Sequence, residues 1–123
     1  MHIGARAYAE VDKAGRVAGA DAHQLVLILF EEAIAELRAA ARAIERADLG
    51  ARSRHLSRAA TIVAALDYSL DHERGGDVAR SLSQVYAYAR ARMSRAASRN
   101  DAAEARVAAD ALSEIAAAWR AIR

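Results

Sequence analysis

The sequence predicts an all-α protein, an antiparallel up-down-up-down four-helix bundle with an N-terminal arm. Three observations carry this prediction. The 123 residues include no proline, the strongest helix breaker, and they are rich in alanine, the strongest helix former. Aromatic residues make up only 5% of the chain, which is too few for a typical β-sandwich. Apolar residues recur at alternating spacings of four and three, the pattern of helices that bury one face.

Breaks in this pattern divide the chain into an arm over residues 1–20 and a bundle over residues 21–123. Asp21 is a good N-cap for the first helix, and Asp48-Leu49-Gly50 makes a short turn after it. Arg74-Gly75-Gly76-Asp77 is the clearest breaker, and Asn100-Asp101 closes the third helix and caps the fourth. Short connections force neighbouring helices to run antiparallel. The helices are expected at about 21–47, 50–71, 76–99 and 101–122.

Each expected helix has one apolar stripe that should face the core. In the first helix the stripe is Val26, Phe30, Ala33, Leu37, Ala40 and Ile44. In the second it is Leu56, Ala59, Val63, Leu66 and Leu70, and in the third Ala79, Leu82, Tyr86, Ala89, Met93 and Ala96. In the fourth it is Ala108, Ala111, Ile115, Ala118 and Ile122, with Leu112 and Trp119 beside the stripe.

The residues that carry chemistry do not form a catalytic or metal-binding pattern. The chain has no cysteine, which excludes disulfides, thiolate zinc sites and a thiol nucleophile. The four histidines are dispersed, no Glu-x-x-His motif occurs, and Gly75-Gly76 lacks the Lys-Ser or Lys-Thr of a phosphate loop. We therefore predict no enzyme activity, no catalytic residue, no metal and no cofactor. A cofactor-bearing bundle enzyme, for example with haem between His55 and Met93, stays as an alternative.

Membrane and nucleic-acid functions find little support in the sequence. The segment Met1–Ala9 lacks the apolar core of a signal peptide, and the longest apolar run, Leu25–Phe30, is too short to span a bilayer. We expect no membrane insertion. Arginines do gather on the second and third helices, so a nucleic-acid-binding bundle is the main alternative function. No helix-turn-helix or zinc pattern accompanies them, and we expect no nucleic-acid partner. These arginines are Arg52, Arg54, Arg58, Arg90, Arg92, Arg95 and Arg99.

Apolar residues outside the core stripes indicate a surface that binds another protein. A bundle helix needs one stripe, and surplus apolar side chains can form a groove that an amphipathic partner helix fills. We predict such a groove on the second and third helices, with the start of the first helix and the arm nearby. The candidate partner-binding residues are Tyr8, Val11, Val17, Leu25, Leu29, Ile62, Tyr68, Val85 and Tyr88.

Over nearly its whole length the sequence resembles the flagellar export chaperones of the FliS family. The order and spacing of several short stretches carry this resemblance, although no single one is diagnostic. They are residues 8–11 (YAEV), 20–25 (ADAHQL), 29–33 (LFEEA), 70–79 (LDHERGGDVA), 85–93 (VYAYARARM), 99–101 (RND) and the late Trp119. The chain departs from the family pattern at Ala22, where a proline is usual, and at Ala87, Arg95 and Ala97. These departures affect details of the partner surface and leave the fold unaffected.

The resemblance implies a cytoplasmic export chaperone. Members of this family are antiparallel helical bundles that bind the C-terminal helical region of flagellin. They prevent its premature polymerisation and deliver it to the flagellar type III export apparatus. Export-gate components and flagellar regulators are further partners that the resemblance suggests.

The arm carries too many glycines and too little periodicity for a fifth bundle helix, yet it contains Tyr8, Val11 and Val17. We expect it to fold back over an apolar groove until flagellin displaces it, as a competing intramolecular ligand. A disordered arm with incidental apolar residues is the alternative.

Overall fold

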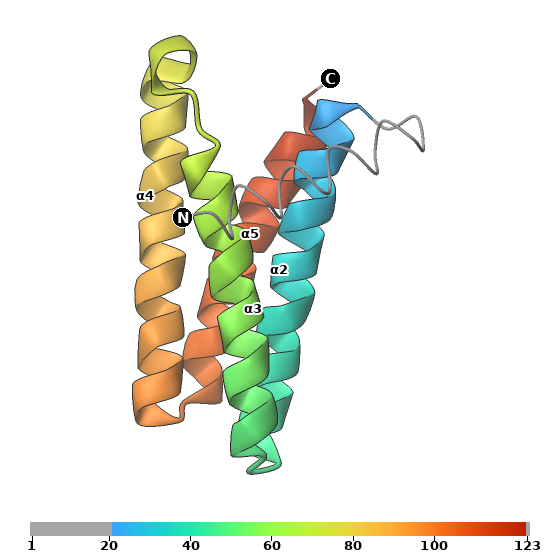
Figure 1. Cartoon of the computed structure of the whole chain (residues 1–123), viewed down its shortest axis with the longest axis vertical. Coiled ribbons are helices and arrows are strands. Elements are labelled where there is room, and N and C mark those ends of the chain that lie inside the picture. Colours follow the sequence, from blue (N-terminus) through green and yellow to red (C-terminus); the bar gives the residue numbers. More distant parts are fainter. Residues whose placement is uncertain (1–20, 123) are drawn as a thin grey trace.

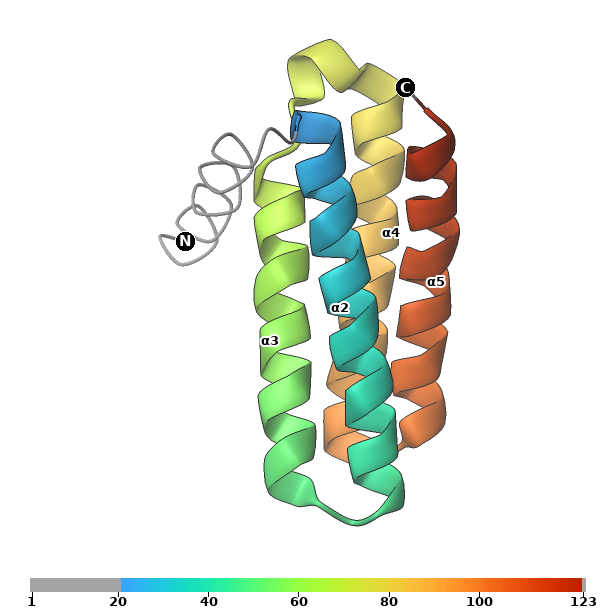
Figure 2. The same cartoon turned by 90° about the vertical axis from the view of Figure 1, so that its right-hand side faces the viewer.

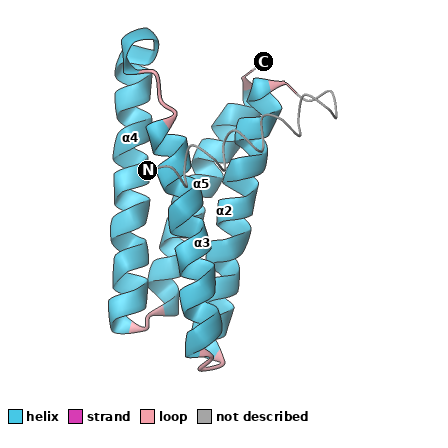
Figure 3. Ribbon diagram, viewed as in Figure 1, coloured by secondary structure: helices cyan, strands magenta, loops and turns pink. Residues whose placement is uncertain are grey.

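The structure, a computed structural model, describes residues 21–122 of the chain. Within that range it consists of four helices: α2 (Ala22–Glu45), α3 (Leu49–Tyr68), α4 (His72–Arg99) and α5 (Ala102–Ala121). Successive helices run up and down and are joined by short connections (Figures 1 and 3), and no strand occurs in this range. The all-α bundle that the sequence predicts is confirmed. The arm over residues 1–20 lies outside the described residues.

Each helix packs against two neighbours, so the bundle has a square cross-section. Helix α2 packs on α3 and α5, and α4 packs on α5 and α3, whereas the backbones of the diagonal pairs stay further apart. The α3–α4 pair has the sparsest contact of the four. Figure 1 shows α4 diverging from α2 and α5 toward the end that carries the α3–α4 connection, and Figure 2 shows the same helices from the side. That end of the bundle is therefore its open end.

Aspartates begin all four described helices. An aspartate carboxylate accepts a hydrogen bond from a backbone N–H that has no partner within the helix. The capping residues are Asp21, Asp48, Asp71 and Asp101. Asn100 ends α4 in the left-handed conformation, with φ 51° and ψ 51°. The caps predicted at Asp21 and Asp101 and the helix end predicted at Asn100 are confirmed.

The diglycine bends α4 but does not precede it. The sequence predicts a helix start near residue 76, whereas α4 begins at His72, because Asp71 caps a first turn ahead of the glycines. Gly76 then leaves helical geometry, with φ 49° and ψ −120°. The left-handed region is open to glycine because it has no Cβ. The break predicted at the diglycine therefore occurs, but as a kink inside α4 and not as the start of the helix.

The core confirms the predicted stripes of the first three helices. Phe30 and Leu37 of α2, Val63 of α3 and Tyr86 of α4 are among the largest fully buried side chains, and Leu112 of α5 meets them. Alanines fill many of the other buried positions, which lets the helix axes approach closely. Three stripe residues near the open end are only half-buried: Val26, Leu70 and Leu82.

The stripe predicted for the last helix is rotated from the observed one. Ala118 and Ile122 are exposed, and Ala111 and Ile115 are half-buried. Alanine occurs on nearly every side of this helix, so a spacing of three and four fits more than one stripe. The prediction followed the larger apolar residues Ile115 and Ile122, neither of which is fully buried. The buried residues of α5 are Glu104, Ala105, Ala108, Ala109, Leu112 and Ala116.

Candidate partner-binding surfaces

An apolar cleft of about 360 Å³ lies at the open end of the bundle. All four described helices contribute to it: the start of α2, the end of α3, the start of α4 and the end of α5. The cleft occurs here because α3 and α4, the loosest pair, separate on either side of the kinked connection. Its apolar lining is Val26, Phe30, Leu66, Leu70, Val78, Ala79, Leu82, Tyr86 and Trp119.

Three aromatic side chains form the inner wall of this cleft. The Phe30 ring lies 6.2 Å from that of Tyr86 and 6.4 Å from that of Trp119, the latter edge-on. Both separations lie in the range of favourable aromatic pairs. Phe30 and Tyr86 are buried, whereas Trp119 is half-buried. The wall is rigid because its buried members are fixed in the core.

A reciprocal pair of hydrogen bonds holds Trp119 in place. The indole Nε1 of Trp119 donates to the carbonyl oxygen of His23 at 2.9 Å. The His23 Nε2 donates in turn to the carbonyl oxygen of Trp119 at 2.6 Å, and the two rings stack at 4.9 Å. His23 therefore bonds across the bundle, joining the first turn of α2 to the end of α5.

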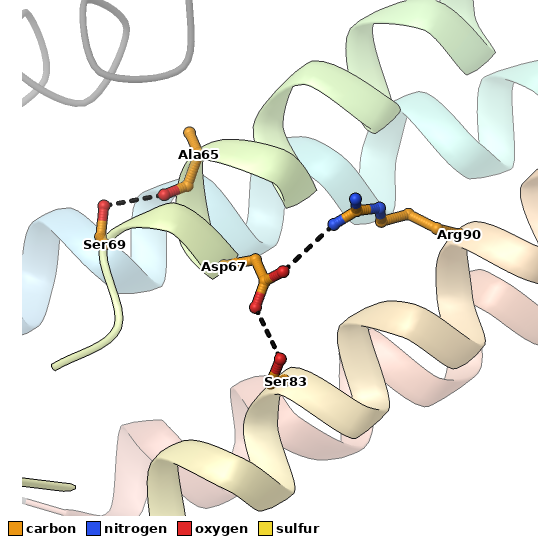
Figure 4. A network of polar contacts seen from close by, with 5 residues as sticks. All are labelled: Ala65, Asp67, Ser69, Ser83 and Arg90. Atoms are coloured by element: carbon orange, nitrogen blue, oxygen red, sulfur yellow. Dashed lines mark hydrogen bonds and ion pairs between the residues drawn. The ribbon is translucent and has the colours of Figure 1, made fainter. Parts of the chain in front are cut away.

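A polar contact bridges α3 and α4 below the cleft (Figure 4). The Asp67 carboxylate accepts a hydrogen bond from Ser83 Oγ at 2.9 Å and pairs with Arg90 Nη1 at 3.2 Å. Ser69 Oγ donates to the carbonyl oxygen of Ala65 at 2.7 Å, within the last turn of α3. Asp67 therefore limits how far the two helices can separate.

A second apolar surface, the α4/α5 groove, adjoins the cleft. Val78 and Leu82 belong to both, and the groove continues along α4 through Val85 to Tyr88. Ile115 of α5 lies across from them. Val78 and Tyr88 are 68% and 45% exposed, values that are high for large apolar side chains in a bundle.

Arg92, itself anchored by an ion pair, holds Tyr88 at the end of this groove. The Arg92 guanidinium lies over the Tyr88 ring, 5.1 Å from its centroid, in a cation–π contact. Arg92 Nη1 donates to Glu104 Oε1 at 2.8 Å, and Glu104 is almost fully buried. The hydrogen bond to Glu104 raises the pKa of Arg92. The Tyr88 ring thus stands against a fixed cation.

The partner residues predicted from sequence lie on more than one surface of the bundle. Val85 and Tyr88 line the α4/α5 groove, but Ile62 lines a separate hollow between α2 and α3. Tyr68 is 60% exposed at the end of α3. A helix presents different faces to its two neighbours, and spacing alone could not tell which neighbour each surplus residue would meet.

Leu25 and Leu29, also candidate partner-binding residues, are buried. Both are 4% exposed, because the start of α2 is covered on both sides and directs them inward. Tyr8, Val11 and Val17 lie outside the described residues. Sequence reasoning missed the cleft itself, and it did not include the lining residues Val78 and Trp119 among the candidate partner-binding residues. The sequence features that could have identified them are a valine two positions after Gly76 and a tryptophan beside the predicted core stripe.

The arginines do not form one free basic surface. Arg90 pairs with Asp67, Arg92 with Glu104 and Arg58 with Glu36. Arg52 donates to Asn100 Oδ1 at 3.0 Å. Carboxylates of neighbouring helices therefore balance three of these seven arginines.

Between residues 21 and 122 no cluster of three or more potential ligands could hold a metal ion. No helix of that range is long and apolar enough to cross a membrane. The fold and these surfaces define a helical bundle with exposed apolar grooves on a rigid core. A family model described as flagellar protein FliS matches residues 4–123, and the chain belongs to the FliS family.

Curated relatives cover nearly the whole chain. It is 38% identical over 120 residues to the flagellar secretion chaperone FliS of Salmonella typhimurium, a match that covers 97% of this chain and 89% of the relative. It is 30% identical over 112 residues to the flagellar secretion chaperone FliSB of Pseudomonas aeruginosa, covering 91% and 89%. The FliS of Vibrio cholerae is 27% identical over 114 residues, covering 93% and 84%. The family is one of chaperones and not of enzymes, as the sequence predicts.

Proposed function

We propose that this protein is a cytoplasmic chaperone that binds the C-terminal helical segment of a flagellin. It keeps that segment from polymerising early and delivers it to the flagellar type III export apparatus. Family membership and the names of the relatives support the general role. The observation that carries the specific proposal is the apolar cleft at the open end of the bundle, which all four described helices line.

The cleft has the chemistry that an amphipathic helix requires. Its lining is mainly apolar, and the half-buried Trp119 presents its ring to the cleft while the buried Phe30 and Tyr86 back it at fixed positions. Helix-in-groove recognition buries the apolar face of the ligand helix. An export substrate whose apolar helical face is buried in this way can no longer associate with other copies of itself. Binding and protection are then the same event.

Calorimetric titration with flagellin tests this function. Intact flagellin should bind the chain with saturable stoichiometry, whereas flagellin lacking its C-terminal helical segment should not. Val26→Asp should weaken binding by about tenfold or more, because it places a charge on the half-buried wall of an apolar cleft. Arg38→Asp is the control, since Arg38 lies on the α2/α5 surface away from the cleft. Equal binding of intact and truncated flagellin would refute the proposal.

A further inference from the structure

We propose that the α4/α5 groove is a second docking surface, whose ligand is an amphipathic helix with lysine or arginine beside its apolar stripe. The inference goes beyond the proposed function, in which the client occupies the cleft. It rests on the shape of the groove and on the sign of its charges. Neither feature is needed to build the bundle core.

The groove has the length and floor of a helix-binding site. Val78, Leu82, Val85 and Tyr88 follow one another along a single face of α4, and Ile115 of α5 forms the facing side. From Val78 to Tyr88 the α4 axis advances by roughly 15 Å, which matches about three turns of a partner helix. Ala111 is the small residue on the α5 side and lets a ligand backbone come close.

The charges that line the groove are negative. Among its described lining residues the ionisable groups besides Tyr88 are the carboxylates of Asp77 and Glu114. Arg80 Nη1 already donates to Asp77 Oδ1 at 2.6 Å, whereas Glu114 forms no ion pair within residues 21–122. Glu114 is exposed beside Val85 and Ile115, so its charge is available to a ligand in the groove.

Arg80 and Arg92, which contact groove residues, already pair with carboxylates. Arg92 lies over Tyr88 and is anchored by the Glu104 carboxylate. Its charge is balanced, and it serves to hold the tyrosine ring as the end wall. An apolar floor with a free carboxylate at its edge complements a helix that is apolar along one stripe and basic beside it. A helix with acidic flanks would meet Glu114 with like charge.

The test uses two synthetic amphipathic helices that share a leucine stripe and differ only in lysine or glutamate flanks. Fluorescence anisotropy with the full chain at low salt should give about fivefold tighter binding of the lysine peptide, the ratio expected for exposed ion pairs. Glu114→Arg should remove or reverse this preference. Glu32→Arg makes the same charge change in the α2/α3 hollow and should leave the preference intact. Rising salt should reduce the preference, because exposed charges are screened.

Val85→Asp tests the apolar floor and should weaken binding of both peptides. If circular dichroism shows that it unfolds the bundle, Glu114→Gln, a change at an exposed position, supplies the second test by reducing the preference without reversing it.

Equal binding of the two peptides, or equal effects of Glu114→Arg and Glu32→Arg, would overturn the proposal. A dimer in sedimentation velocity that Glu114→Arg dissociates would overturn it too, because the ligand would then be a second copy of the chain. Glu114→Arg should leave flagellin binding in the cleft unchanged. The proposed function and the proposed second docking surface can therefore fail independently of each other.

Discussion

His23 and Trp119 show how one residue pair can serve both the fold and the cleft. A carbonyl oxygen only accepts, so the His23 Nε2 must carry the proton that bonds to the Trp119 carbonyl. The other ring nitrogen, Nδ1, is buried and has no hydrogen-bond partner among residues 21–122. The stacked rings then close the bundle between the start of α2 and the end of α5. Trp119 is thereby presented to the cleft in one orientation.

His23→Ala should lower the free energy of unfolding by about 1–2 kcal/mol, because it removes one side-chain hydrogen bond and the ring contact. Urea unfolding followed by circular dichroism measures the change. Gln24→Ala, at the exposed neighbouring position, is the control and should have little effect. A His23→Ala protein as stable as the Gln24→Ala protein would show that the pair does not stabilise the bundle.

Two carboxylates near the α2–α3 turn link stability to pH. Hydrogen bonding to Arg106 lowers the pKa of Glu45, and hydrogen bonding to the backbone N–H of Ala51 lowers the pKa of Asp48. A lowered folded-state pKa gives stability that is present above the unfolded-state value and is lost as the pH falls through the folded-state value.

The urea midpoint should therefore decline below about pH 4, where unperturbed carboxylates begin to protonate. The double variant Glu45→Gln, Asp48→Asn should decline less steeply, since asparagine keeps the helix cap without a titrating group. Parallel pH profiles for the two proteins would contradict the assigned contacts.

At the scale of elements, Gly76 and Gly50 both lie near helix starts, but changing them to alanine should alter stability in opposite directions. Gly76 has φ 49°, so Gly76→Ala should destabilise the protein by about 1 kcal/mol through backbone strain. Gly50 lies in the first turn of α3, and an added Cβ would meet the flexible end of Arg54 at 3.4 Å and the Asp48 Oδ1 at an ordinary contact distance of 3.7 Å. Gly50→Ala should therefore stabilise by about 0.5 kcal/mol through helix propensity. Thermal unfolding of the pair measures both signs, and equal shifts would refute the kink assignment.

The element boundaries were predictable because caps and breakers act locally. Asp21, Asn100 and Asp101 mark helix ends through bonds to residues within one turn, and their roles are confirmed. The rotation of α5 was not predictable, because an alanine-rich helix lacks a clear apolar face. The candidate site was recovered only in part: Val85 and Tyr88 do line a groove. The cleft depends on how far α3 and α4 separate, which no local pattern specifies.

At the scale of the whole molecule, the bundle combines a rigid core with an open end. Helix α2 packs closely on both α3 and α5, whereas α4 is attached to α3 by few contacts and by the Asp67 bridge. Apolar surface that would close the core of a tighter bundle is thereby left open as a cleft. The relatives of this chain are secretion chaperones, and an open apolar cleft suits a protein that binds other proteins.

Trp119 allows the central claim to be tested directly, because it is the single tryptophan of the chain and it lines the cleft. Titration with a tryptophan-free peptide from the C-terminal helical segment of flagellin should shift its emission to shorter wavelength and saturate, because the bound helix excludes water from the indole. A scrambled peptide of the same composition should leave the emission unchanged. Saturable binding of the flagellin peptide without any change in Trp119 emission would place the client elsewhere and contradict the account.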